Sequence, residues 1–218
     1  EGDDTLNAGS GDDILTGGTG DDILFSSSGA DSIDGGAGAN DRFIFGGFNN
    51  DLASDHTINS SAVESTVFQT PNRSVDFKAS YSNIEALDVG FGPADQNVLV
   101  ELSGLPASVT LDTRGPSASD SVTINGTAGI DALDLSGTTL TDGTTTIDLG
   151  GVENLTLDIS SGGADTISVD QDFTGSARSI VVTGDLSDDT VSLESTTKQQ
   201  QVYIFSEVDY FTQLREVL

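Results

Sequence analysis

The stretch Gly17-Gly18-Thr19-Gly20-Asp21-Asp22-Ile23-Leu24-Phe25 decides the fold of the first part of this 218-residue chain. It joins a glycine-rich segment to an aspartate, Asp22, and places the aliphatic Leu24 two positions later. The same arrangement returns every nine residues, with the aspartates Asp4, Asp13, Asp22 and Asp31 and the aliphatics Leu6, Leu15, Leu24 and Ile33. The period predicts one glycine turn, one carboxylate and one buried aliphatic side chain for each nine residues.

The repeat extends from Gly2 to about Phe45 and changes in its last two copies. In the fourth copy, Ser26-Ser27-Ser28 replaces the first glycines. The fifth copy carries one extra residue, so Asp41 follows Asp31 by ten positions and Asn40 takes the expected place. We expect the aromatic end of this copy to close the stack.

Stacked turns of this composition predict calcium sites. Glycine permits tight turns that aim carbonyl oxygens inward, and each aspartate adds a carboxylate. One turn supplies about half of the six to eight oxygens that Ca²⁺ takes, so two turns must share an ion. In a flattened roll, turns 18 residues apart lie on one edge, which pairs Asp4 with Asp22, Asp13 with Asp31, and Asp22 with the shifted Asp41.

The energetics predict that this segment folds only with the ion. Two carboxylates about 5 Å apart repel by roughly 3 kcal/mol at an effective dielectric constant near 20. Each turn buries one aliphatic side chain, worth about 1.5–3 kcal/mol, whereas ordering its backbone costs about 1 kcal/mol or more per residue. Millimolar calcium supplies the missing stabilisation and cytosolic calcium does not.

Residues 2–45 resemble the RTX, or haemolysin-type calcium-binding, family. The resemblance implies a calcium-loaded parallel β-roll, export in an unfolded state through a type I secretion channel, and folding outside the cell. It assigns carboxylate ligands to the sixth position of each copy, here Asp4, Asp13, Asp22 and Asp31. Asp41 of the shifted copy is a further candidate ligand, because it faces Asp22 in the stack. The resemblance assigns carbonyl ligands to Gly9, Gly11, Gly17, Gly18, Gly20, Gly35, Gly36 and Gly38.

The amino-acid composition limits which partners and metal ions the chain is expected to bind. The chain has 36 acidic and 7 basic residues, a net charge of −29, which argues against nucleic acid and anionic membranes. It has no Cys and one His, His56, so zinc, copper and iron sites are not expected. No apolar run reaches the roughly 20 residues of a membrane-spanning helix.

The remainder of the chain predicts an all-β structure. We expect residues 1–45 to form the β-roll, 46–62 a loop or linker, and 63–218 a β-rich domain. Its short alternating runs are Val98–Leu102, Ser108–Thr113, Val122–Asn125, Thr145–Leu149, Leu155–Ile159, Ile180–Thr183 and Val202–Phe205. Degraded copies of the repeat around Asp131, Asp165 and Asp189 favour an irregular β-solenoid, with a β-sandwich as the alternative. The last residues, Val208–Leu218, carry the one weak helical pattern.

Catalysis is not expected. The chain lacks a Gly-x-Ser-x-Gly elbow, a His-Glu-x-x-His motif and a cysteine nucleophile. Ser54-Asp55-His56 is the one place where a triad can be imagined, and a lone histidine in a polar loop is expected to be a solvated side chain. The neighbours of the ligand aspartates, Asp3, Asp12 and Asp21, are expected to point into solvent.

Two functions remain open. The first is a secreted, calcium-binding structural segment of a bacterial surface layer or large adhesin, which associates with itself or with cell-surface polysaccharide. The alternative is the calcium-dependent secretion and folding module of a type I-secreted enzyme or toxin, with the catalytic part upstream. The chain opens within a repeat, so we expect it to be a fragment of a longer protein.

Overall fold

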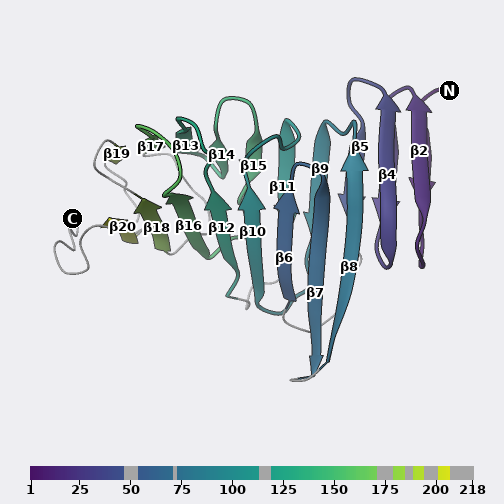
Figure 1. Cartoon of the computed structure of the whole chain (residues 1–218), viewed down its shortest axis with the longest axis horizontal. Coiled ribbons are helices and arrows are strands. Elements are labelled where there is room, and N and C mark those ends of the chain that lie inside the picture. The colour runs from purple at the N-terminus through teal and green to yellow at the C-terminus, as the bar shows by residue number, and fades with distance from the viewer. Residues whose placement is uncertain are drawn as a thin grey trace.

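A computed structural model of the chain shows an elongated stack of strands (Figure 1). The structure describes residues 1–46, 54–70, 73–112, 119–170, 179–184, 189–193 and 201–206. These residues form twenty strands and no helix. The all-β prediction is therefore confirmed, and the expected helical pattern at Val208–Leu218 lies outside the described residues.

The strands form two sheets of ten strands each. The first sheet has the order β1 (Thr5–Asn7), β3 (Ile23–Ser26), β5 (Arg42–Phe45), β9 (Ala86–Gly90), β11 (Ser108–Asp112), β15 (Thr146–Asp148), β14 (Thr139–Thr141), β13 (Ala132–Ser136), β17 (Thr166–Val169) and β19 (Thr190–Leu193). The second has the order β2 (Ile14–Thr19), β4 (Ala30–Ala37), β8 (Arg73–Ser82), β7 (Ala62–Thr70), β6 (Ser54–Asn59), β10 (Gln96–Glu101), β12 (Ser121–Asn125), β16 (Asn154–Ile159), β18 (Ser179–Gly184) and β20 (Gln201–Ser206).

Most neighbouring strands are parallel, because the chain winds from one sheet to the other and returns one coil further on. The parallel pairs β1 with β3 and β2 with β4 are typical of this path, and β16 pairs in the same way with β18 near the other end. An antiparallel β-sandwich cannot produce this pattern. The structure is therefore a β-roll that continues into an irregular β-solenoid, as the sequence predicts.

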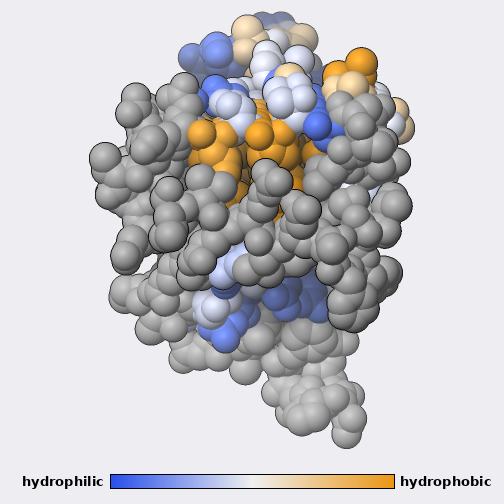
Figure 2. Space-filling model, turned by 90° about the vertical axis from the view of Figure 1, so that its left-hand side faces the viewer, coloured by the Kyte–Doolittle hydropathy of each residue, from blue (hydrophilic) through white to orange (hydrophobic). Residues whose placement is uncertain are grey.

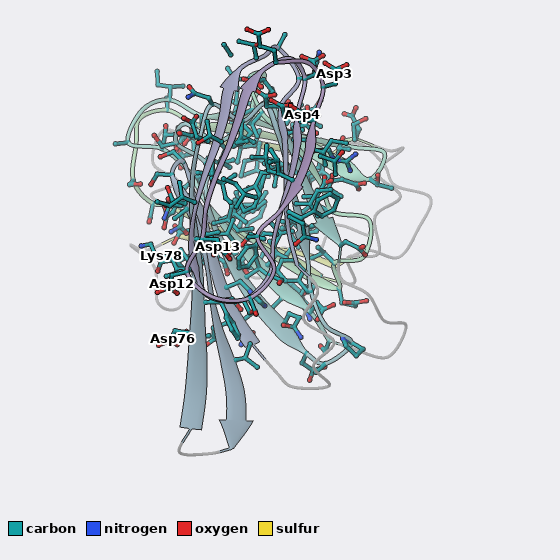
Figure 3. All side chains as sticks on the ribbon, turned by 90° about the vertical axis from the view of Figure 1, so that its right-hand side faces the viewer. Asp3, Asp4, Asp12, Asp13, Asp76 and Lys78 are labelled. Carbon is teal, nitrogen blue, oxygen red and sulfur yellow. The ribbon has the colours of Figure 1, made fainter. Side chains whose placement is uncertain are left out.

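Two antiparallel insertions interrupt the solenoid in the described part of the chain. In the second sheet, β7 pairs antiparallel with both β6 and β8. In the first sheet, β14 pairs antiparallel with β13 and β15. The hairpin of β7 and β8 extends beyond the edge of the roll (Figures 1 and 3). These insertions lengthen two of the coils, which is one reason why the aspartates beyond residue 45 lose their regular spacing; other coils are 24 residues long without an insertion among the described strands.

The core is a narrow column of side chains between the sheets. Alternation along each strand points every second side chain inward, as in β16, whose Leu155, Leu157 and Ile159 are buried. One cluster of contacting buried residues runs from Leu15 to Val182. At the far end of the stack, apolar side chains lie between hydrophilic ones (Figure 2), where Val191 and Val202 are only partly buried.

The expected loop over residues 46–62 was wrong for Ser54–Asn59, which forms β6. The polar composition hid an alternating strand, in which His56 and Ile58 are buried. The remaining strands that the sequence predicts are present, within one or two residues at each end. The division into domains at residues 45 and 62 stays a prediction.

Candidate metal-binding edges

The aspartates of the repeat lie on two opposite edges of the roll. Asp3 and Asp4 lie at one edge, and Asp12 and Asp13 lie at the other (Figure 3). We call the first the Asp4 edge; it consists of the turns at residues 2–4, 20–22, 38–41 and 83–85, which lead into β1, β3, β5 and β9. The opposite Asp13 edge consists of the turns at residues 8–13 and 27–29 together with the start of β4.

Turns 18 residues apart stack on one edge, as predicted. Thr5 pairs with Ile23 across β1 and β3, and Ile14 pairs with Ser32 across β2 and β4. This register places the two aspartates of each predicted pair on neighbouring coils of the same edge. The extra residue of the fifth copy is absorbed in its turn, because Arg42 pairs with Ile23.

Within each pair, a backbone N–H of one coil donates to the carboxylate of the next. Asp4 N–H donates to Asp22 Oδ1 at 2.7 Å, and Asp22 N–H donates to Asp41 Oδ1 at 2.7 Å. On the other edge, Asp13 N–H donates to Asp31 Oδ1 at 3.0 Å. These bonds use one oxygen of each carboxylate and fix the direction in which the other oxygen points.

The second oxygens of Asp22 and Asp41 are buried without a hydrogen-bond partner. Both residues are fully buried, with 0% exposure, and their Oδ2 atoms have no donor in reach. A buried carboxylate oxygen without a partner costs several kcal/mol unless a cation or donor satisfies it. The Asp4 edge therefore has the electrostatic requirement of a cation site.

Glycines create the space beside these two carboxylates. A Cβ on Gly17 would overlap Asp22 Oδ2 and would lie 2.5 Å from the carbonyl oxygen of Gly35. A Cβ on Gly38 would lie 2.7 Å from both oxygens of Asp41 and would overlap the carbonyl oxygen of Gly20. Carboxylate and carbonyl oxygens thus share a cradle that only glycine leaves open, and hard oxygen donors of this kind suit Ca²⁺.

The other predicted carbonyl ligands are less enclosed. Gly18 and Gly36 stack one above the other, and a Cβ on Gly36 would overlap the carbonyl oxygen of Gly18. At Gly9 and Gly11, an added Cβ would meet nothing within 4 Å. The ligand roles of all these residues stay predictions; the structure brings Gly17, Gly20, Gly35 and Gly38 closest to buried carboxylates.

On the Asp13 edge, Asp31 is already satisfied. Its Oδ1 accepts the N–H of Asp13, and its Oδ2 accepts the hydroxyl of the buried Ser26 at 2.5 Å. Ser26 stands five residues before Asp31, as Gly17 stands before Asp22. The serine hydroxyl therefore takes the place beside Asp31 that the glycine leaves open at Asp22. Asp13 Oδ2 has no hydrogen-bond partner, although the residue is only partly buried.

The neighbouring aspartates Asp3, Asp12 and Asp21 are exposed, as expected. They also form an outer ladder that the sequence did not reveal. Asp21 N–H donates to Asp3 Oδ1 at 3.0 Å, and Ala30 N–H donates to Asp12 Oδ1 at 2.9 Å. Hydrogen bonds from the Asn40 side chain and the Ala39 N–H lower the pKa of Asp21.

The ladder of carboxylates extends beyond the nonapeptides. Asp41 N–H donates to Glu85 Oε2 at 2.9 Å, and Asp120 N–H donates to Glu153 Oε2 at 3.1 Å. The sequence did not identify these glutamates as part of the edges. A signal exists, however, because Ile84-Glu85-Ala86-Leu87 is similar to Val152-Glu153-Asn154-Leu155.

No three carboxylate or imidazole groups of the described residues converge on one point. An ion at either edge would therefore rely on one or two carboxylates together with backbone carbonyls. That donor set is compatible with calcium, which accepts carbonyl oxygens readily. It differs from the nitrogen and sulfur ligands of structural zinc.

His56 is a core residue, and its expected solvation was wrong. Its exposure is 4%, its ring centroid lies 4.6 Å from that of Phe91, and Nε2 lies 2.9 Å from Gln96 Oε1. Burial lowers its pKa, although the Gln96 bond and the charge of Asp55 oppose that shift. The strand alternation that buries His56 removes it from the surface where a triad would act.

Comparison with known proteins identifies the repeat. The family model of the RTX calcium-binding nonapeptide repeat (4 copies) matches residues 1–33 and 16–53. The N-terminal region is an RTX repeat. No curated protein and no solved structure matches the chain. RTX nonapeptide repeats bind calcium and are not catalytic, which agrees with the donor set of the Asp4 edge. The described residues include no helix long and apolar enough to cross a membrane.

Proposed function

We propose that the RTX region binds calcium at the Asp4 edge and folds only when calcium is present. The observation that carries the proposal is the pair of fully buried Asp22 and Asp41 oxygens without hydrogen-bond partners. Gly17 and Gly38 leave space beside these oxygens, and carbonyl oxygens line the same space. Cations bound beside these oxygens would satisfy both carboxylates, and without them the two buried charges oppose folding.

Calcium concentration then decides where the region folds. With a site dissociation constant near 10⁻⁴ M, typical of extracellular calcium modules, 10 mM calcium stabilises each site by about 2.7 kcal/mol. Cytosolic calcium would stabilise it hardly at all. We infer that the chain is secreted and folds outside the cell, and the RTX repeat favours export through a type I channel.

We further propose a structural role, as a segment of a surface layer or large adhesin. The RTX region and the solenoid share one continuous core, which supports a long rigid rod rather than a short folding tag. The end strands of the two sheets, β1 with β2 and β19 with β20, have unpaired edges among the described strands. Such edges pair with further strands, either of the same polypeptide or of a second copy.

The alternative function is a secretion and folding module of a type I-secreted enzyme or toxin. Calcium binding by the RTX region fits both functions. Self-association separates them, because a lattice or adhesin segment is expected to assemble or to bind cell-surface polysaccharide, and a folding module is not.

The test combines far-UV circular dichroism with light scattering on the full chain. We expect calcium to increase the β signal, chelation to reverse the increase, and the calcium-loaded chain to scatter as an oligomer. A β signal that is the same in calcium and in chelator would contradict calcium-dependent folding. Calcium-dependent folding without assembly or polysaccharide binding would contradict the structural role and favour the module.

A further inference from the structure

The turn at residues 83–85 belongs to the Asp4 edge, although it lies outside the RTX repeat. Thr16 pairs with Asp34 and Gly18 with Gly36 across β2 and β4, which sets Gly17 beside Gly35. Asp34 pairs with Ser82 across β4 and β8, which sets Gly35 beside Asn83. Asn83 therefore occupies, in the next coil, the position that Gly17 and Gly35 occupy in their own coils.

The cradle at Asp22 is repeated at Asp41. A Cβ on Gly17 would meet Asp22 Oδ2 and the carbonyl oxygen of Gly35. A Cβ on Gly35 would overlap the carbonyl oxygen of Asn83 and would lie 2.9 Å from Asp41 Oδ2. In both places, a glycine leaves open a space bordered by a buried carboxylate oxygen and a carbonyl of the following coil. This arrangement of glycine, carboxylate and carbonyl therefore extends to the coil of Asn83, although the nonapeptide sequence ends before it.

The backbone of Asn83 is shaped for this place. Its φ of 52° is the left-handed conformation, which asparagine tolerates better than most residues because of its short polar side chain. Its Nδ2 donates to Asp34 Oδ1 at 2.7 Å, which ties the turn to the preceding coil. The left-handed backbone conformation places the Asn83 carbonyl oxygen beside Gly35.

Glu85 has the same relation to Asp41 that Asp41 has to Asp22. Its Oε2 accepts the N–H of Asp41 at 2.9 Å, as Asp41 Oδ1 accepts the N–H of Asp22 at 2.7 Å. Two backbone bonds, from Glu85 N–H and Ala86 N–H to the carbonyl oxygen of Asp41, hold the turn against the fifth copy. Glu85 is a positioning residue, because it orients the turn of Asp41 from the coil beyond.

We propose that Asp41, Asn83 and Gly20 form a divalent-cation site of their own, with calcium as its ligand. Asp41 contributes its unpartnered, fully buried Oδ2, and Asn83 and Gly20 contribute carbonyl oxygens. The site rests on the proposed calcium function of the RTX region. The site closes only when β8 pairs with β4, so the ion joins the repeat to a turn that lies 42 residues after Asp41 in the chain.

The experiment counts calcium ions bound to the full chain by isothermal titration calorimetry. Asn83→Val disfavours the left-handed conformation, because its side chain is β-branched, and turns the carbonyl away. Asn83→Gly is the matched control, because glycine keeps that conformation and loses only the side-chain amide. Asp41→Asn removes the charged ligand. We expect Asn83→Val and Asp41→Asn each to lose one ion, the double variant to lose the same one ion, and Asn83→Gly to bind as many as the original chain.

A folded Asn83→Val variant that binds the full number of ions would overturn the proposal, and so would a double variant that loses two ions. Failure of the original chain to bind calcium would instead contradict the calcium function on which the site rests. If Asn83→Val does not fold, a crystal structure of the unaltered chain with calcium decides. We expect an ion within roughly 2.3–2.6 Å of Asp41 Oδ2 and the Asn83 carbonyl oxygen; an ion at Asp22 but none at Asp41 would refute the site.

Discussion

Asp22 in the RTX region and Asp131 in the solenoid occupy similar places, but their carboxylates have different partners. Each follows a glycine by five residues, Gly17 or Gly126, and each donates its N–H to the carboxylate of the next coil. Asp22 keeps one oxygen without a partner. Both oxygens of Asp131 accept hydrogen bonds from Thr127, from its N–H at 2.7 Å and from its hydroxyl at 2.9 Å.

The two sites differ in the hydrogen bonds that come from the residue after the glycine. Gly18 follows Gly17 in the RTX region, and Thr127 follows Gly126 in the solenoid. Thr127 donates both its N–H and its hydroxyl to Asp131, whereas Asp22 Oδ2 accepts no hydrogen bond. The solenoid ladder continues from Asp131 N–H to Asp165 Oδ1 at 2.8 Å and from Asp165 N–H to Asp189 Oδ1 at 2.9 Å. The same stacking of carboxylates is therefore expected to need calcium near Asp22 and not near Asp131.

The largest effect is expected from Asp22→Ala. It removes the proposed ligand and the acceptor of the Asp4 N–H, so the free energy of unfolding of the RTX region in 10 mM calcium should fall by about 3–5 kcal/mol. Urea denaturation, with and without calcium, measures this change in the free energy of unfolding. Asp34→Ala is the control, because Asp34 is only partly buried and accepts bonds from Asn83 and Ser82. Equal losses for the two variants would contradict a special role of Asp22.

A second variant should create a calcium site beside Asp31 on the Asp13 edge. Ser26→Gly removes the hydroxyl from Asp31 Oδ2 and restores the glycine of the repeat. At the lowest calcium concentration that folds the RTX region, the variant should be about 1–3 kcal/mol less stable than the original chain, because a buried oxygen loses its donor. With calcium, titration calorimetry should show one additional ion. A variant that loses stability equally in both conditions would show that the hydroxyl does not stand in for an ion.

Thr127→Val should destabilise the solenoid to the same extent with and without calcium. The hydroxyl that donates to Asp131 Oδ1 and accepts the N–H of Gly129 is lost, at a cost of about 1–2 kcal/mol. Thr127→Ser keeps the hydroxyl and serves as the control. Urea denaturation in calcium and in chelator measures both variants. A calcium-dependent loss in Thr127→Val would place an ion near Asp131 and remove the contrast with Asp22.

The smallest expected effect is a loss of folding stability at acidic pH. It comes from His56 in β6, the strand between the two regions. Burial lowers the folded-state pKa of His56 below its unfolded value of about 6.5. The unfolded chain therefore binds more protons, and the contribution of His56 to stability, present above pH 6.5, is lost as the pH falls below that value. Denaturation at pH 7.5 and 5.5 should show a loss that His56→Gln reduces. An equal loss in that variant would assign the effect to the carboxylates.

The sequence predicted the fold where its pattern was periodic. The nine-residue spacing placed Asp22 beside Asp4 and Asp41, because a fixed coil length determines which turns stack. It could not place Asn83 or Glu85, because the antiparallel β6–β8 insertion separates them from the repeat by a length that no period encodes. The burial of His56 was missed because polar neighbours masked the alternation of β6.

One part of the carboxylate ladder, around Asp22, is expected to need calcium, and the other part, around Asp131, is not. Hydrogen–deuterium exchange of the full chain, followed by peptide mass spectrometry in calcium and in chelator, tests it directly. We predict that chelation removes the protection of residues 1–46 while residues 119–170 keep theirs. Equal protection of residues 1–46 in both conditions, or a loss that spreads equally to residues 119–170, would contradict the account.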